Sequence, residues 1–156
     1  MSDIENRLKA MGIALPVASA PMANYVPFVM TGNLLVISGQ LCFGADGTLA
    51  PRHIGKLGGA ISADAGKEAA QLCAINLLAQ AKAALGNLER IKRCVRLGGF
   101  INATPDFTTL PAIMNGASDL MVAALGDAGR HARSTVGMSV LPLDCAVEVE
   151  AMFEFA

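Results

Sequence analysis

The sequence predicts an α+β fold: a mixed β-sheet with two long helices packed on one face, preceded by a short helix. Strand-like and helix-like segments follow in the order strand, strand, helix, strand, helix, strand, strand. Apolar residues recur at helical spacing over 62–85, and segment 146–155 alternates between apolar and polar side chains. At 156 residues the chain has the length of one ordinary domain. We therefore expect a single domain over 1–156, with 1–19 as an N-terminal extension.

The first half is expected to contain one short helix and one hairpin. Polar residues at the start of 3–11 can cap a short helix, and a glycine ends it. The strand-like runs 25–30 and 34–38 flank the turn 31–33, which predicts a β-hairpin. The glycine-rich segment 43–59 is typical of a loop.

The middle of the chain predicts a long helix, a strand and a second helix. Ser62 begins the helix that ends near residue 85, and the run 91–101 reads as a strand. The pair Gly98–Gly99 within that strand indicates a bulge or a close approach to the backbone. A second helix is expected over 105–125, with Pro111 early enough to be tolerated in its first turn.

Two strands, over 133–141 and 146–155, complete the expected fold. The turn 142–144 joins them, which predicts a C-terminal hairpin. Because both helices should cover one face of the sheet, the other face has no covering helix. In so apolar a chain, we expect that face to meet other copies of the protein in an oligomer.

Composition narrows the class of function. Twelve basic and thirteen acidic residues give a net charge of -1 with no basic tract, so nucleic-acid capture is not indicated. Hydrophobic residues make up 53% of the chain, yet polar residues interrupt its longest apolar run, at 72–85, so no membrane span is expected. The N-terminus does not resemble a signal peptide. Four widely spaced cysteines predict buried free thiols in a reducing cytoplasm and no metal pair.

Arg133 is the leading candidate for chemistry. It opens an otherwise apolar strand, where its planar guanidinium could bind a carboxylate through two parallel hydrogen bonds. The main-chain N–H of Thr135, two residues further along, could add a third donor. Glu148 lies near the start of the last strand, so an antiparallel partner could bring it toward the far end of the Arg133 strand or into a neighbouring subunit's site.

Two motifs resemble the RidA/YjgF family of imine and enamine deaminases, formerly called endoribonuclease L-PSP. Tyr25–Val26, Gly32–Asn33 and Ser38–Gly39–Gln40 are similar to its N-terminal hairpin. Its C-terminal signature resembles Arg133–Val136, Leu141–Pro142 and Val147–Ala151. The resemblance extends from about Ala20 to Phe155.

The resemblance implies a chorismate-mutase-like fold assembled as a homotrimer, with clefts between subunits. It implies that Arg133 binds the carboxylate of a 2-imino acid, helped by the main chain of Thr135. Tyr25, Ser38 and Gly39 would line the pocket, and Glu148 would orient a water near the imine carbon. The implied reaction hydrolyses compounds such as 2-aminoacrylate or 2-iminopropanoate to 2-oxo acids and ammonia, with no metal and no cofactor.

Departures from the family pattern keep other functions open. Pro111 stands where shorter members have a pocket asparagine, and Asn115 is a possible substitute. The stretch 115–131 is also longer, which indicates a longer-chain branch. A trimer that binds small carboxylates without turnover is the alternative. An endoribonuclease is disfavoured by the net charge and by the presence of one Tyr and no Trp for base stacking.

Overall fold

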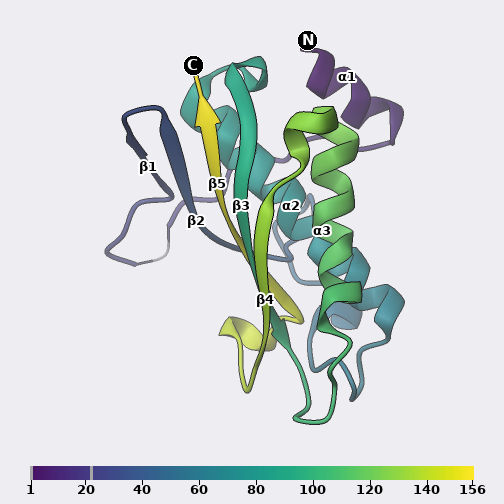
Figure 1. Ribbon diagram of the computed structural model, residues 1–156. Helices are drawn as coiled ribbons and strands as arrows, with labels where there is room; N and C mark the ends of the chain where they lie inside the picture. The colour runs from purple at the N-terminus through teal and green to yellow at the C-terminus, as the bar shows by residue number, and fades with distance from the viewer. Residues whose placement is uncertain (1, 22) are drawn as a thin grey trace.

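The computed structural model describes residues 2–21 and 23–156, and it confirms the mixed α+β architecture (Figure 1). Five strands form one sheet in the order β1-β2-β5-β3-β4, in which only the β3–β4 pair is parallel. Two long helices lie on one face of this sheet. The elements are α1 (Asp3–Ala10), β1 (Phe28–Thr31), β2 (Leu34–Leu41), α2 (Ala63–Leu85), β3 (Ile91–Asn102), α3 (Leu110–Leu125), β4 (Ala132–Met138) and β5 (Val147–Phe155).

The core lies between the sheet and the helices α2 and α3. The predicted alternation in β5 is confirmed, because Val147, Val149, Ala151 and Phe153 are buried while the residues between them are partly exposed. The opposite face of the sheet carries partly exposed apolar side chains, including Val36. No helix among the described residues is long and apolar enough to cross a membrane.

The N-terminal helix α1 is fixed to the end of the helical layer. Ser2 caps it with a capping box, as its polar start predicts. The Arg7 guanidinium donates to the Ala124 carbonyl at 2.7 Å, and the Ile4 amide donates to Glu89 Oε1 at 2.8 Å. Because Ala124 lies in the last turn of α3, the cation also meets the negative end of that helix. The helix α1 is therefore packed onto α3.

The predicted C-terminal hairpin is wrong. Strands β4 and β5 do not pair, because β3 lies between them, parallel to β4 and antiparallel to β5. The connection crosses the end of β3, where the buried Asn102 amide donates to Asp144 Oδ1 at 2.8 Å and to the Cys145 carbonyl at 3.1 Å. Leu143 and Asp144 adopt left-handed backbone conformations in this connection. β4 is thus an edge strand.

Three element boundaries also differ from those expected. The second long helix begins at Leu110, because residues 105–106 form a turn that the Phe107 amide closes onto the Thr104 carbonyl. Pro111 therefore falls in the first helical turn, where its missing N–H costs nothing. The first strand begins at Phe28, which leaves Tyr25 in the segment before it, and β4 ends at Met138.

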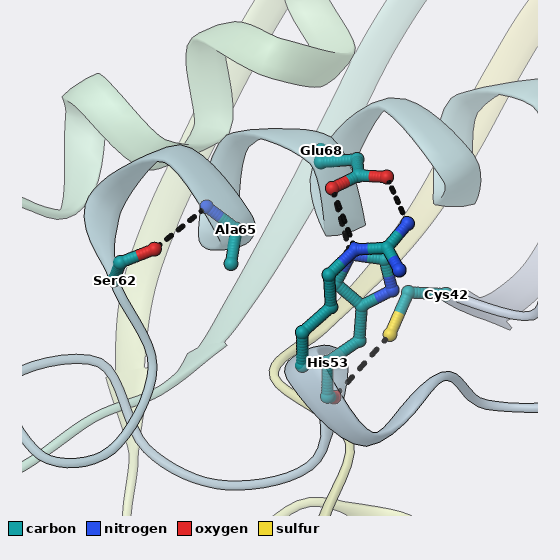
Figure 2. A network of polar contacts seen from close by, with 6 residues as sticks. Cys42, His53, Ser62, Ala65 and Glu68 are labelled. Carbon is teal, nitrogen blue, oxygen red and sulfur yellow. Dashed lines mark hydrogen bonds and ion pairs between the residues drawn. The ribbon is translucent and has the colours of Figure 1, made fainter.

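A polar network ties the glycine-rich loop to α2. Figure 2 shows the Glu68 carboxylate on α2 directed toward the His53 ring. Glu68 Oε2 lies 3.3 Å from His53 Nε2 and accepts from Arg52 Nε at 3.0 Å. The His53 side chain is 1% exposed, and the Cys42 thiol donates to its carbonyl at 3.8 Å. All four cysteines are buried and free, as expected.

Candidate functional site

Arg133 lies on the edge strand β4, and its side chain points toward α3. Its strand partner Leu97 is buried against the helices, so the two side chains share the helix-covered face. The guanidinium Nη1 donates to Asn115 Oδ1 at 2.8 Å and to Ser118 Oγ at 3.0 Å, while Nη2 donates to the Pro111 carbonyl at 3.3 Å. All three acceptors are neutral. No carboxylate of the described residues pairs with this cation.

Thr135 follows on the same face of β4. Its hydroxyl oxygen is buried and has no hydrogen-bond partner among the described residues. The adjacent β3 residue is Gly99, and a side chain there would collide with the Met114 thioether of α3. Gly99 thus marks a close approach by a helix, which is one of the two possibilities that a glycine pair in a strand predicted. It lets α3 pack near the strand that carries Arg133 and Thr135.

Glu148 lies in the middle of the sheet and points away from the helices. It pairs with Phe100 of β3 and with Leu41 of β2. Its carboxylate fills the space beside Gly39, where any β-carbon would collide with it. The absence of a side chain at Gly39 therefore leaves space for the Glu148 carboxylate. Burial raises the pKa of Glu148, and the nearby negative charge of Glu150 raises it further.

Tyr25, Ser38 and Gly39 come together in a small cavity of about 110 Å³. The Ser38 hydroxyl donates to the Val26 carbonyl at 2.8 Å, so its lone pairs remain free to accept. The rest of the lining comes from the segment before β1, from β2 and the residues after it, and from α2: Ser19, Ala20, Pro21, Pro27, Gln40, Leu41, Phe43 and Gln80. Residues 19–21 thus bring the N-terminal segment to this cavity.

The predicted residues form two separate groups within one chain. Tyr25, Ser38 and Gly39 lie before and within β2, beside Glu148 on the neighbouring β5. Arg133 and Thr135 lie on β4, and β3 separates β4 from β5. The faces differ too. On β3, the partner of Arg133 and the partner of Glu148 are three residues apart in a regular register. Because side chains alternate along a strand, this odd separation places the two partners on opposite faces of the sheet. One chain therefore does not bring Arg133 and Glu148 together.

Ser118 and His131 complete the surroundings of Arg133, and the motifs alone did not indicate the first of them. His131 Nε2 lies 2.9 Å from Ser118 Oγ, and its Nδ1 lies 2.6 Å from the Gly129 carbonyl oxygen. A signal was present in the sequence. Within Leu110–Leu125 the polar side chains are Asn115, Ser118 and Asp119 only, and the first two share a face at i,i+3 spacing.

This chain has clear relatives among known protein families and curated proteins. Residues 5–155 match the family model described as "YjgF/chorismate_mutase-like, putative endoribonuclease". Protein TCP17 of Trypanosoma cruzi is 44% identical over 148 residues, which are 94% of this chain and 91% of that protein.

Two solved structures are similar to the whole fold. The first is described as a "putative endoribonuclease" from Shewanella oneidensis; it is 36% identical with a TM-score of 0.94, over 99% of this chain and 100% of its own. The second is RidA from an Antarctic Psychrobacter, which is 27% identical with a TM-score of 0.61, over 88% of this chain and 94% of its own. With the sheet order, the helical layer and nearly the full length matched, the chain belongs to the RidA/YjgF family, with its chorismate-mutase-like fold.

Proposed function

We propose that the protein hydrolyses reactive 2-imino acids, such as the 2-iminopropanoate that arises from 2-aminoacrylate, to 2-oxo acids and ammonia. The observation that carries this proposal is the guanidinium of Arg133. Three neutral oxygen atoms hold it in place, and no carboxylate of the described residues neutralises it. A fixed, unpaired cation at a strand edge favours a small anion with a planar carboxylate.

The chemistry needs few groups. Water adds to the imine carbon, and the C–O bond forms as the nitrogen takes up the electron pair of the C=N bond. The C–N bond then breaks, and ammonia leaves the 2-oxo acid. Glu148 would accept one proton of the water and deliver it to nitrogen, which gives the carbinolamine. The proton of the new hydroxyl would then pass by the same carboxylate to nitrogen as the C=O bond forms and the C–N bond breaks, and Ser38 Oγ would accept from the imine N–H. Such acid–base help contributes roughly 10²–10⁴-fold.

A complete site would need two copies of the chain. Arg133 and Thr135 would come from one subunit, and Tyr25, Ser38, Gly39 and Glu148 from its neighbour. The separation of these groups on opposite faces of the sheet supports this arrangement. We propose a homotrimer, in which the apolar uncovered face of the sheet is buried between copies. The four free thiols suit a reducing compartment, and we propose the cytoplasm.

A coupled assay tests the proposal. A dehydratase generates the imine from serine, semicarbazide traps it, and the protein competes with the trap. We expect faster formation of the 2-oxo acid with the native protein and none of this acceleration with Arg133→Ala. Glu148→Ala should also lose activity but still bind 2-oxobutanoate, because the carboxylate anchor is intact.

The same experiment separates the second candidate. If the native protein binds 2-oxobutanoate but leaves the trapping rate unchanged across small 2-imino acids, it is a carboxylate binder and not a deaminase. Equal activity of the native protein and Glu148→Ala would contradict the proposed mechanism.

A further inference from the structure

We infer that Ser118, with Asn115 and His131, positions Arg133 so that the edge of its guanidinium formed by Nε and Nη2 faces the substrate. This inference rests on the proposed function, because it names residues that would set substrate binding at the same site. None of these three residues is proposed to touch the reacting atoms.

Arg133 has more hydrogen-bond donors than its described neighbours use. A guanidinium has five N–H groups. Two on Nη1 are used by Asn115 and Ser118, and one on Nη2 is used by the Pro111 carbonyl. The remaining two are on Nε and Nη2, the two atoms that form one edge of the guanidinium, and no described residue accepts from Nε. This pair matches the two oxygens of a carboxylate.

The hydrogen bonds behind Ser118 lead through His131 to the Gly129 carbonyl. The Gly129 carbonyl can only accept, so His131 Nδ1 carries the hydrogen and donates to it. In the neutral imidazole, Nε2 then accepts the hydrogen of the Ser118 hydroxyl. This orients the lone pairs of Ser118 toward Arg133 Nη1. With this tautomer of His131, donation runs one way, from Arg133 to Ser118, to His131 and to Gly129.

The Gly129 end of this hydrogen-bond chain is packed against α3. A β-carbon on Gly129 would collide with the main chain of α3 at Met121 and Val122. The carbonyl that holds His131 therefore belongs to a segment pressed against the same helix that carries Asn115 and Ser118. Three attachments to one helix leave the guanidinium little freedom to rotate, and pre-organisation of this kind reduces the entropy lost on binding.

The test uses the full-length protein and three variants: Ser118→Ala, Ser118→Thr and the control Asp119→Ala. Asp119 is exposed on the same helix and takes no part in the network. Two quantities are measured: kcat and KM in the imine assay, and the Kd of 2-oxobutanoate by calorimetry. A carboxylate contact is equal in ground state and transition state, so its loss should change KM and leave kcat in place.

Ser118→Ala should raise KM and Kd roughly 10-fold, as loss of a hydrogen bond to a charged group does, with kcat changed less than about 2-fold. Ser118→Thr keeps the hydroxyl and should restore both values, and Asp119→Ala should match the native protein. Thermal melting checks that each variant is folded. Native values of KM and Kd in folded Ser118→Ala would overturn the inference, as would a loss confined to kcat.

The outcomes also separate this inference from the proposed function. If the native protein binds 2-oxobutanoate without any deaminase activity, the Kd series still decides the role of Ser118. If the native protein binds no 2-oxobutanoate, the positioning role fails together with the carboxylate site.

Discussion

At the scale of single residues, Glu148 shows how position in a sheet tunes a carboxylate. Its side chain is partly buried beside Gly39, and burial raises its pKa because the charged form loses water. Glu150, on the same face, adds a second negative charge. An elevated pKa makes the carboxylate a better proton acceptor near neutral pH, which is what the proposed reaction needs.

The acid limb of activity should therefore depend on Glu150. Turnover requires ionised Glu148, so it should fall as the pH drops through the raised pKa, at a higher pH than for an ordinary glutamate. Glu150→Gln removes the like charge and frees Arg96, 3.5 Å away. We expect the acid limb of kcat/KM to move to lower pH. Glu154→Gln, further along the same face, is the control, and a limb that stays in place or moves upward in Glu150→Gln contradicts this account.

Glu68 has the opposite shift and bears on stability. The Arg52 guanidinium beside it, with a smaller contribution from His53, holds the pKa of Glu68 down to about 2. A lowered folded pKa stabilises the protein above the unfolded value of about 4.3, and this contribution is lost as the pH falls toward 2.

Glu68→Gln should lower the melting temperature at pH 7 by a small amount. The ion pair is largely exposed, and such pairs contribute about 1 kcal/mol or less. The difference from the native protein should shrink below about pH 4. It should vanish near the pKa of Glu68, which Arg52 lowers to about 2. Asp127→Asn, at a fully exposed carboxylate, is the control variant. A deficit that persists at acid pH would point to lost packing at His53 instead.

At the scale of elements, the close packing of α2 and α3 depends on a glycine. A β-carbon on Gly116 would collide with the main chain of α2 at Lys67. Gly116 also lies between Asn115 and Ser118, so the spacing of the two helices sets the place of both groups that hold Arg133.

Gly116→Ala should therefore destabilise the protein. Helix propensity alone predicts a gain of roughly 1 kcal/mol for this change, whereas overpacking predicts a loss of roughly 1–3 kcal/mol. The sign of the change in the free energy of unfolding, measured with urea, decides between the two. The binding of 2-oxobutanoate should weaken as well, because the helix must move. Stabilisation would mean that α2 yields at Lys67 without cost.

Local patterns predicted the elements well where one period governed them. The helix α2 and the strand β5 carry regular apolar spacing, and their residues are buried as that spacing requires. The pairing of the last two strands was predicted wrongly. The short connection after β4 is typical of a hairpin, and no local signal shows that β3 takes the place beside β5. Asn102, a polar residue at the end of β3, binds the connection that crosses this strand.

At the scale of the whole molecule, the correct strand order changes how the site is understood. From the sequence, Arg133 was a candidate because it opens an apolar strand, and Glu148 was a candidate because of its motif. A hairpin would have placed them on neighbouring strands. The sheet instead puts them two strands apart and on opposite faces, so the distance between them follows from topology and not from spacing along the chain.

Complementation between subunits tests this conclusion. Arg133→Ala and Glu148→Ala should each be inactive as homo-oligomers. If each site takes Arg133 from one subunit and Glu148 from its neighbour, random mixing of the two variants makes about a quarter of the sites complete, whatever the number of subunits in the ring. Co-expression, with one tag on each variant and purification of the mixed species, also removes the inactive homo-oligomers, so in the proposed trimer the complete sites should rise to about one third and activity should recover to that level. A single-chain site would recover none, since every chain then lacks one of the two groups. Arg133→Ala mixed with the double variant Arg133→Ala/Glu148→Ala is the matched control, because no neighbour can then supply the arginine and activity should remain absent.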